Sequence, residues 1–385
     1  MKSKSKAPGF LSIFLLTIMI TVQVLTLGIL WLLQMLPMEL LVIVGCVMVI
    51  LSTLILRMTF SRKVKRQRLR RFVSGMLTLC TIVLCVGACL SAPLVSGTIN
   101  SMFGSNELGT MPVITPKNPE SDAFGIYLSG SDTRNGKLTK SRSDVNLIMI
   151  LNPTGKQALL VNTPRDYYVS NPAGKGAKDK LAHCGLYGTD NSREALMQLY
   201  DIPITYAAQI NFKGFETLID ALGGVTIHSD FAFTTTAGGY YIKAGDNHLN
   251  GAKALAFARE RSKLAGGDIT RGKNQMKLIT ALIKQVSPAN LMANYREILD
   301  SLEGMFITDM PLSTITKLVT TQLTDLNDWE IFTYSVTGTG GTDYNYSLGT
   351  NAYVMYPDAN SVSHASALMQ RMLEGNALSA DDVNQ

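Results

Sequence analysis

Cysteine is scarce in this chain, and four of its five cysteines lie in hydrophobic stretches near the N-terminus. Only Cys184 falls in the remaining sequence, so no disulfide can form within that part. The sequence therefore carries no sign of oxidative folding. His183 precedes Cys184, but a thiol and its base rarely act from neighbouring positions, which argues against a cysteine nucleophile here.

Zinc-binding and dinucleotide-binding patterns are also missing. His228, His248 and His364 show no metal-ligand spacing, and no pair of cysteines lies outside the hydrophobic stretches. The glycine pairs at 223–224 and 266–267 lack the G-x-G-x-x-G context and are typical of turns or helix ends. These absences argue against a zinc site and against a nucleotide-binding glycine loop.

Acidic residues are almost absent from the first 71 residues, which hold 11 Lys or Arg and a single acid, Glu39. Because the whole chain has 35 basic and 29 acidic side chains, the remaining residues have 24 and 28. That part is therefore mildly acidic, with a net charge of −4. It lacks the basic surface that nucleic-acid binding requires, and we expect no nucleic-acid partner.

Three uncharged apolar stretches occupy residues 10–33, 40–56 and 72–95. Each is long enough, or nearly so, to cross about 30 Å of hydrocarbon as a helix, so we predict three transmembrane helices. The segments before the first and the third stretch are strongly basic, with Lys2, Lys4, Lys6, Arg57, Arg62, Lys63, Lys65, Arg66, Arg68, Arg70 and Arg71. Basic flanks stay on the cytoplasmic side, so three spans place the C-terminal part outside the cell.

The chain thus divides into a membrane anchor at residues 1–95, a Gly-, Ser-, Asn- and Pro-rich tether at 96–122, and one large domain at 123–385. An alternative interpretation takes Cys89 as a lipid-attachment site, or the residues near Ala92 as a signal cleavage site. Such signals normally stand at the N-terminus of a chain, whereas these follow two other apolar stretches. A retained anchor at the cell membrane is the favoured interpretation.

From residue 123 onward, strand and helix patterns alternate. Strands are predicted at residues 124–128, 145–151, 157–161, 205–210, 225–227, 329–334 and 353–355. Helices are predicted at residues 192–200, 212–222, 251–261, 268–286, 289–305, 312–323 and 361–373. The pattern predicts an α/β (α+β) three-layer sandwich, with a central mixed sheet, helices on both faces, and three transmembrane helices before it.

Charged side chains stand at the ends of the first three predicted strands. Asp132 follows the first strand, Arg142 and Asp144 precede the second, and Arg165 closes the third after Thr163 and Pro164. Mg²⁺ takes hard oxygen ligands, and arginine binds phosphate through two parallel hydrogen bonds. This combination of side chains therefore suits a divalent cation beside a phosphate. Without a cation each carboxylate would pair with an arginine, and Arg142 is the nearest candidate in the sequence.

A second charged cluster lies at residues 257–286. In the helix predicted from Asp268, that residue, Arg271 and Gln275 share one face, while Met276, Ile279, Leu282 and Ile283 form an apolar stripe on another. Two roles are predicted for Asp268, which can both hold. It is well placed to cap the helix N-terminus, and it can deprotonate an acceptor hydroxyl.

Arg259 and Arg261 are two residues apart, and on a continuous helix their side chains would point in nearly opposite directions. They can meet at one ligand only if the helix ends or the chain becomes extended there. A solvated surface charge is the ordinary explanation for any one of these arginines. Several arginines near element ends, together with two carboxylates, favour a phosphate site instead.

Six motifs in order resemble the LytR-CpsA-Psr family, closest to the streptococcal CpsA type of capsule protein. They are GSDTR, SRSDVNLIMILNP, NTPRD, INFKGFETLIDALGGV, LNGAKALAFARERS and GDITRGKNQ. The resemblance covers about residue 123 to the end, and several ordered motifs are far more specific than one pattern. It implies a membrane-anchored phosphotransferase that moves capsular polysaccharide, or a related glycopolymer, from a polyprenyl-pyrophosphate carrier to peptidoglycan.

The same resemblance implies a Mg²⁺ ion between carboxylates and pyrophosphate, with the prenyl chain in an apolar tunnel. By this resemblance Asp132 and Asp144 become the metal ligands. From their shared helix face, we predict Asp268 and Arg271 as the catalytic residues. The pyrophosphate-binding residues become Arg142, Arg165, Arg259, Arg261, Arg271 and Gln275. Capsule assembly proteins are candidate partners besides the lipid-linked polysaccharide and the peptidoglycan acceptor.

The sequence departs from the family pattern in two places. Many members carry an arginine immediately before the glutamine that matches Gln275, whereas this chain has Asn274. One phosphate contact is therefore expected to be absent. CpsA-type members can also carry an additional domain between anchor and catalytic domain, where only the tether at residues 96–122 is present.

Two other functions remain open at this stage. The domain could hydrolyse the same lipid pyrophosphate, in which case product would form without an acceptor. It could also be a receptor that binds lipid-linked glycan and regulates capsule production without transfer, and a catalytically dead variant would then still support regulation.

Overall fold

The computed structural model describes residues 10–32, 38–60, 67–103, 118, 121–133, 138–264, 267–285, 302–311, 313–315, 317–318 and 329–384. The chain forms two compact units, Met1–Thr98 and Ile99–Gln385, which are described separately below.

The first unit contains three long apolar helices, α1 (Phe10–Leu32), α2 (Met38–Thr59) and α3 (Gln67–Phe103). Each includes a stretch of sufficient length and hydropathy to cross a membrane, at Ser12–Trp31, Leu41–Thr59 and Phe72–Cys89. Only 11% to 22% of the residues in the apolar windows of these stretches are buried, as expected for helices that face lipid. Ser52 donates a 2.8 Å hydrogen bond to Gln23 between two helices. The three predicted apolar helices are confirmed and indicate membrane anchoring.

Helix α3 is longer than the predicted span and continues to Phe103, so residues 96–103 of the expected tether are helical. Once a helix has formed, each further residue costs little to add, and the segment after Ser96 contains no proline before Phe103. Of the remaining tether, the structure describes residues 118, 121 and 122.

A six-stranded sheet forms the centre of the second unit. Its strands, in spatial order, are β11 (Phe306–Thr308), β6 (Tyr206–Asn211), β1 (Phe124–Ser131), β2 (Ser143–Asn152), β3 (Gln157–Asn162) and β12 (Glu330–Ser335). The β1–β6 and β3–β12 pairs are parallel and the other pairs are antiparallel, so the sheet is mixed. All six residues of β3 are buried, as its continuous apolar run predicts.

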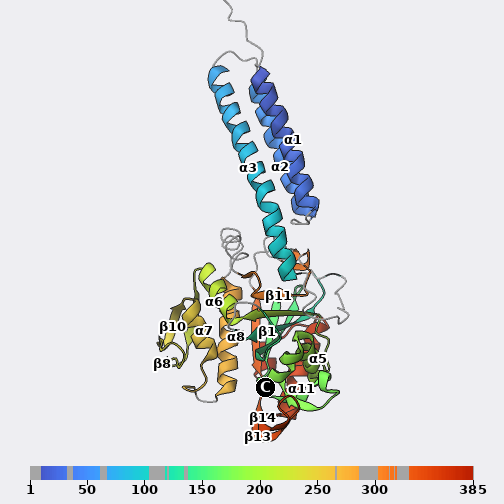
Figure 1. Cartoon of the computed structure of the whole chain (residues 1–385), viewed down its shortest axis with the longest axis vertical. Helices are drawn as coiled ribbons and strands as arrows, with labels where there is room; N and C mark the ends of the chain where they lie inside the picture. The colour runs from blue at the N-terminus through green and yellow to red at the C-terminus, as the bar shows by residue number, and fades with distance from the viewer. Residues whose placement is uncertain are drawn as a thin grey trace, which may run out of the picture. The chain divides into compact units, whose positions relative to one another are not determined.

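Helices cover both faces of this sheet (Figure 1). On one face, Tyr127, Ile148 and Leu159 pack in a core that includes residues of α4 (Leu181–Cys184), α5 (Thr189–Tyr200) and α11 (Ala359–Leu373). On the other face, Leu147 and Leu160 contact Met276 of α8 (Asp268–Gln285). The predicted three-layer arrangement is therefore confirmed.

In the part of the chain that the structure describes, four two-stranded ribbons and several short helices surround the sheet. The ribbons are β4 (Tyr168–Ser170) with β5 (Lys178–Lys180), β7 (Val225–Ser229) with β10 (Gly245–Leu249), β8 (Phe233–Thr234) with β9 (Tyr241–Ile242), and β13 (Gly338–Asn345) with β14 (Thr350–Pro357). The helices are α6 (Phe212–Ala221), α7 (Gly251–Arg259), α12 (Ala380–Val383) and the 3-10 turns Pro172–Gly174 and Gly185–Tyr187. The helices predicted at 289–305 and 312–323 lie mostly outside the described residues.

The topology gathers several chain segments at one edge of the sheet. Because β1 and β3 are antiparallel to β2, the end of β1, the start of β2 and the end of β3 lie together. The parallel partners β6 and β12 end at the same edge. Asparagine side chains cap the N-termini of two helices. Asn211 accepts a hydrogen bond from Gly214 N at the start of α6, and Asn250 accepts one from Lys253 N at the start of α7.

Candidate functional site

Asp144 and Arg165 form an ion pair at this edge, with 2.7 Å between Arg165 Nη1 and Asp144 Oδ1. Asp144 lies near the start of β2, and Arg165 follows β3 after the Thr163–Pro164 turn. Burial by itself lowers the pKa of Arg165, but its hydrogen bond to Asp144 and the nearby carboxylates outweigh burial and raise the pKa. The guanidinium therefore stays charged, as phosphate binding requires.

Asp132 faces Arg259, whose Nη2 lies 3.9 Å from Asp132 Oδ2. The guanidinium carbon of Arg259 also lies 4.5 Å from the ring centroid of Phe212, the first residue of α6, so a cation–π contact positions this arginine. Each carboxylate thus has an arginine neighbour, but neither neighbour is Arg142. Arg142 is exposed and does not line the cavity described below.

Arg259 and Arg261 reach the same cavity because α7 ends between them. The helix terminates at Arg259, and Glu260 has an extended backbone with φ −65° and ψ 130°. Both arginines line the cavity. The condition deduced from their spacing, that the chain must leave the helix there, is confirmed.

Glu260, which the sequence analysis did not single out, organises this turn. Its side chain is buried, with 2% of the residue exposed. Oε1 accepts hydrogen bonds from Thr236 Oγ1 at 3.1 Å and from the backbone N–H groups of Arg261 and Lys263 at 3.0 Å each. Oε2 accepts one from Thr236 N at 2.5 Å.

Burial raises the pKa of Glu260, but these hydrogen bonds outweigh burial and hold the pKa below its usual value. In the sequence, a glutamate between two arginines is typical of a charged surface. Two of the hydrogen-bond donors to Glu260 belong to Thr236, which is distant in the sequence, so local patterns do not show them.

Helix α8 carries the remaining polar groups. Arg271 Nη2 lies 2.6 Å from Asp268 Oδ1 and donates to the backbone oxygen of Asp144 at 3.4 Å. Gln275 Nε2 donates to Ala258 O at 3.2 Å. The helix can approach the sheet this closely because it has Gly272 at the contact: a Cβ there would lie 2.0 Å from Asn162 Nδ2.

The predicted capping role of Asp268 is not what the structure shows. The helix begins at Asp268 itself, which lies in the first turn, and its carboxylate pairs with Arg271. Burial raises the pKa of Asp268, although the charge of Arg271 offsets part of this rise. Burial likewise lowers the pKa of Arg271, although Asp268 offsets part of that change. A raised carboxylate pKa beside a cleft is a common property of general bases.

Most of the polar groups described above line one end of a cavity of about 660 Å³ between the sheet and helices α6, α7 and α8. The polar end contains Asp144, Arg165, Arg259, Glu260, Arg261, Arg271 and Gln275. The remaining wall is largely apolar and includes Leu128, Ile210, Phe212, Phe215, Leu218, Leu278, Ile279, Leu282 and Phe306. Asp132 and Asp268 contact lining arginines from outside the wall.

The donor set has the chemistry that Mg²⁺ takes from a protein when a substrate supplies the other ligands. Asp132 directly follows β1, and Asp144 lies near the start of the neighbouring strand β2. Their side chains are 31% and 19% exposed, respectively. Mg²⁺ usually binds one or two carboxylates and completes its shell with phosphate oxygens and water. No group of three or more potential metal-ligating side chains occurs among the described residues, so a purely protein-made cage is not available there.

The LytR_cpsA_psr family model matches residues 104–370, which include the whole of this site. The chain belongs to the LytR_cpsA_psr family. Among curated relatives, a polyisoprenyl-teichoic acid–peptidoglycan teichoic acid transferase TagU of Bacillus mycoides is 34% identical over 192 residues, covering 50% of this chain and 62% of that protein. TagU of Oceanobacillus iheyensis is 33% identical over 230 residues, covering 58% and 69%.

Solved structures of similar fold include TagV of Bacillus subtilis, with a TM-score of 0.55 and 27% identity over 67% of this chain and 99% of that one. TagT bound to LI-WTA has a TM-score of 0.54 and 23% identity over 74% and 99%, which establishes a shared fold. The family position usually occupied by arginine, Asn274, is buried and donates to Phe257 O at 3.4 Å. This side chain therefore contacts α7.

Proposed function

We propose that this protein is a membrane-anchored phosphotransferase that moves capsular polysaccharide or a related glycopolymer from a polyprenyl-pyrophosphate carrier to peptidoglycan. The observation that carries the proposal is the joining of an arginine-rich polar end to a long apolar wall in one cavity. A lipid pyrophosphate has the same two parts in the same order. The names of the TagU relatives, which act on polyisoprenyl-linked teichoic acid and peptidoglycan, support the same reaction class.

In this proposal the arginines bind the pyrophosphate. Arg165 reaches the polar end from the segment after β3, and Arg259 and Arg261 reach it from the end of α7. Arg271, on α8, lies beside Asp144. Their charges stabilise the phosphoryl group during transfer and the lipid phosphate that leaves. A Mg²⁺ ion bound by Asp132 and Asp144 would add charge neutralisation at the phosphate oxygens.

The reaction exchanges the phosphoanhydride bond of the pyrophosphate for a new phosphoester bond. A hydroxyl oxygen of the acceptor sugar attacks the sugar-linked phosphorus, and the bond from that phosphorus to the lipid phosphate breaks. Asp268 accepts the hydroxyl proton, for which the raised pKa of a buried carboxylate is suited. The apolar wall holds the prenyl chain and keeps water from the phosphorus, which favours transfer to a sugar over hydrolysis.

The proposed topology places this domain outside the cell, where peptidoglycan lies. It rests on the three apolar helices and on the basic residues that flank them. A phosphatase reporter fused after Ser96 should be active and one fused after Arg66 inactive. The opposite pattern would place the domain in the cytoplasm and remove it from its acceptor.

Reconstitution tests the activity. The full chain in detergent is incubated with lipid-linked polysaccharide, peptidoglycan and Mg²⁺, and covalent conjugate is measured. Conjugate that requires all three supports transfer. Release of lipid phosphate at the same rate without peptidoglycan would instead indicate a hydrolase, and binding without either product would indicate a receptor.

A further inference from the structure

The β13–β14 ribbon exposes an unusual group of tyrosines. Tyr344 and Tyr353 are each 51% exposed and Tyr346 is 40% exposed. Tyr344 and Tyr353 are diagonal neighbours on one face, because Thr342 pairs with Tyr353 and Asn351 pairs with Tyr344. Exposed aromatic clusters of this kind mark interaction surfaces more often than isolated exposed side chains do.

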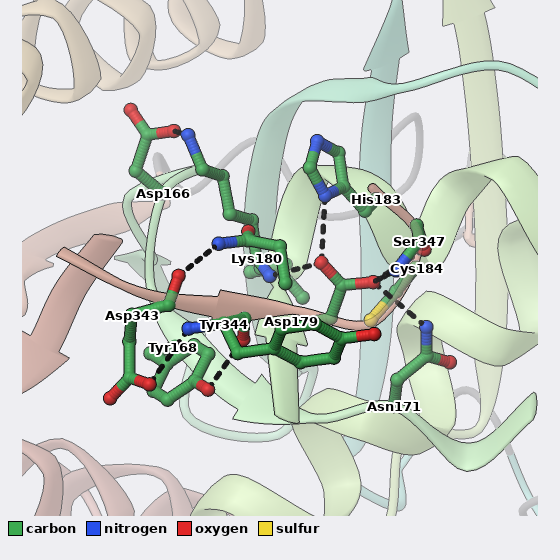
Figure 2. Close-up of polar contacts among 12 residues, drawn as sticks. Asp166, Tyr168, Asn171, Asp179, Lys180, His183, Cys184, Asp343, Tyr344 and Ser347 are labelled. Carbon is green, nitrogen blue, oxygen red and sulfur yellow. Dashed lines mark hydrogen bonds and ion pairs between the residues drawn. The ribbon is translucent and has the colours of Figure 1, made fainter. Parts of the chain in front are cut away.

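The ribbon is built to hold these rings in place. Tyr353 lies against Gly340, where a Cβ would come within 3.0 Å of the tyrosine hydroxyl. The ammonium group of Lys180 lies 5.7 Å from the Tyr353 ring centroid. Tyr168 OH donates to the backbone oxygen of Tyr344 at 2.7 Å, and this pair is seen in Figure 2. A surface that is ordered in advance loses less entropy on binding.

A buried carboxylate fixes the turn of the ribbon. Asp179 is fully buried, bonds His183 Nδ1 at 2.7 Å and accepts hydrogen bonds from the backbone N–H and the hydroxyl of Ser347 (Figure 2). Burial raises the pKa of Asp179, but these bonds outweigh it and lower the pKa. The carboxylate therefore remains ionised and holds the turn.

The ribbon is connected to the polar end of the cavity. Met355 N donates to Asp166 O at 2.8 Å, and Lys180 Nζ lies 3.1 Å from Asp166 Oδ1. Asp166 directly follows Arg165, which lines the cavity. The base of the ribbon follows β12, which ends at the same sheet edge. Lys180 therefore links Tyr353 to the segment that carries Arg165.

We propose that Tyr344, Tyr346 and Tyr353 bind the glycan strand of the acceptor, an inference that rests on the proposed transfer to a sugar hydroxyl. An acceptor strand must reach the phosphorus from outside the apolar cavity, so its neighbouring sugars need a surface beside Arg165. The C–H faces of pyranose rings pack on aromatic rings. The exposed polar groups of Thr342 and Asn351 between the tyrosines suit sugar hydroxyls rather than acyl chains.

Binding of the full chain in detergent to insoluble peptidoglycan, and to soluble glycan strands, tests this surface. In the test variants Tyr344 and Tyr353 are both changed to Leu, which keeps apolar volume without the ring, or both to Phe, which keeps the ring. Tyr241→Leu is the matched control, since Tyr241 is 68% exposed on the separate β8–β9 ribbon. The Leu variant should bind glycan about tenfold more weakly and need about tenfold more acceptor for half-maximal transfer, which is the scale of two aromatic contacts.

The Phe variant and Tyr241→Leu should behave like the parent, and the affinity for lipid pyrophosphate should be unchanged in all of them. Equal glycan binding by parent and Leu variant would overturn the proposal. A dimeric parent and a monomeric Leu variant that bind glycan equally would also overturn the proposal, since the surface would then join two copies of the chain. If the parent binds glycan through these rings yet forms no conjugate, the surface stands and the proposed transfer reaction fails.

Discussion

Replacing Glu260 by glutamine should weaken donor binding although Glu260 itself need not touch the donor. The carboxylate accepts four hydrogen bonds, three through Oε1 and one through Oε2. In Glu260→Gln the amide NH₂ must face either the Thr236 N–H or the three donors at Oε1, so a donor opposes a donor in both orientations. The remaining bonds also lose the benefit of an ionised acceptor.

The size of the effect follows from these contacts. Hydrogen bonds to a charged group contribute about 1.5 to 3 kcal/mol and neutral ones about 0.5 to 1.5 kcal/mol. Because Thr236, Arg261 and Lys263 are exposed and water compensates part of the loss, we expect a destabilisation of about 2 kcal/mol. This corresponds to a fall in melting temperature of about 5 °C. Affinity for lipid pyrophosphate should fall at least about tenfold, since Arg259 and Arg261 lose the turn that lets both reach the cavity.

Thermal unfolding and binding of a fluorescent polyprenyl pyrophosphate, both measured on the full chain, are the assays. Glu216→Gln is the control, because among the described residues the Glu216 carboxylate pairs with the exposed Lys213 at 3.5 Å, so the change should leave both measurements unchanged. Parental donor affinity in Glu260→Gln, with or without a lower melting temperature, would refute the positioning role.

Four further predictions concern the polar end of the cavity. Arg165→Lys should lower donor affinity by at least about tenfold, because an ammonium group cannot make the planar two-pronged contact; equal affinity of the lysine variant and the parent argues against that contact. The transfer rate should fall at low pH with a midpoint above the ordinary aspartate pKa of about 3.9, because burial raises the pKa of Asp268 and a base acts only when deprotonated. Asp268→Asn should lose the transfer rate while donor affinity is kept; normal turnover in this variant excludes Asp268 as the base. Asp144→Ala should abolish the response of transfer to Mg²⁺ while circular dichroism stays parental; a retained Mg²⁺ response means that Asp144 is not a metal ligand.

Much of the fold follows from local sequence patterns. The buried runs of β1, β2 and β3 and the amphipathic α8 are strong periodic signals, and the structure places them within a few residues of the predicted bounds. The β13–β14 ribbon was harder to predict, because β13 contains Gly338, Gly340 and Gly341, which lie against tyrosines of other segments. Glycine lowers the apparent strand propensity of such a segment when its partners are unknown.

The site was predictable where a single element carries it and harder where segments meet. The common face of Arg271 and Gln275 follows from helical spacing. The spacing of Arg259 and Arg261 showed that the helix must end between them if both reach one ligand, although the predicted helix continued to residue 261. The ion partner of Asp144 did not follow, because proximity in the sequence favoured Arg142 whereas the antiparallel β2–β3 pair brings Arg165 to it. Long-range pairing of this kind is absent from local patterns.

The most direct test of the account follows the phosphorus atom. A donor carrying radioactive phosphorus only at the sugar-linked position is incubated with the full chain, Mg²⁺ and peptidoglycan, and the label is then located. Attack at that phosphorus predicts label that is covalently bound to peptidoglycan together with the polysaccharide, and unlabelled lipid phosphate. Polysaccharide joined to peptidoglycan with all of the label left on the lipid would contradict it, since the bond broken would then be the one between sugar and phosphate.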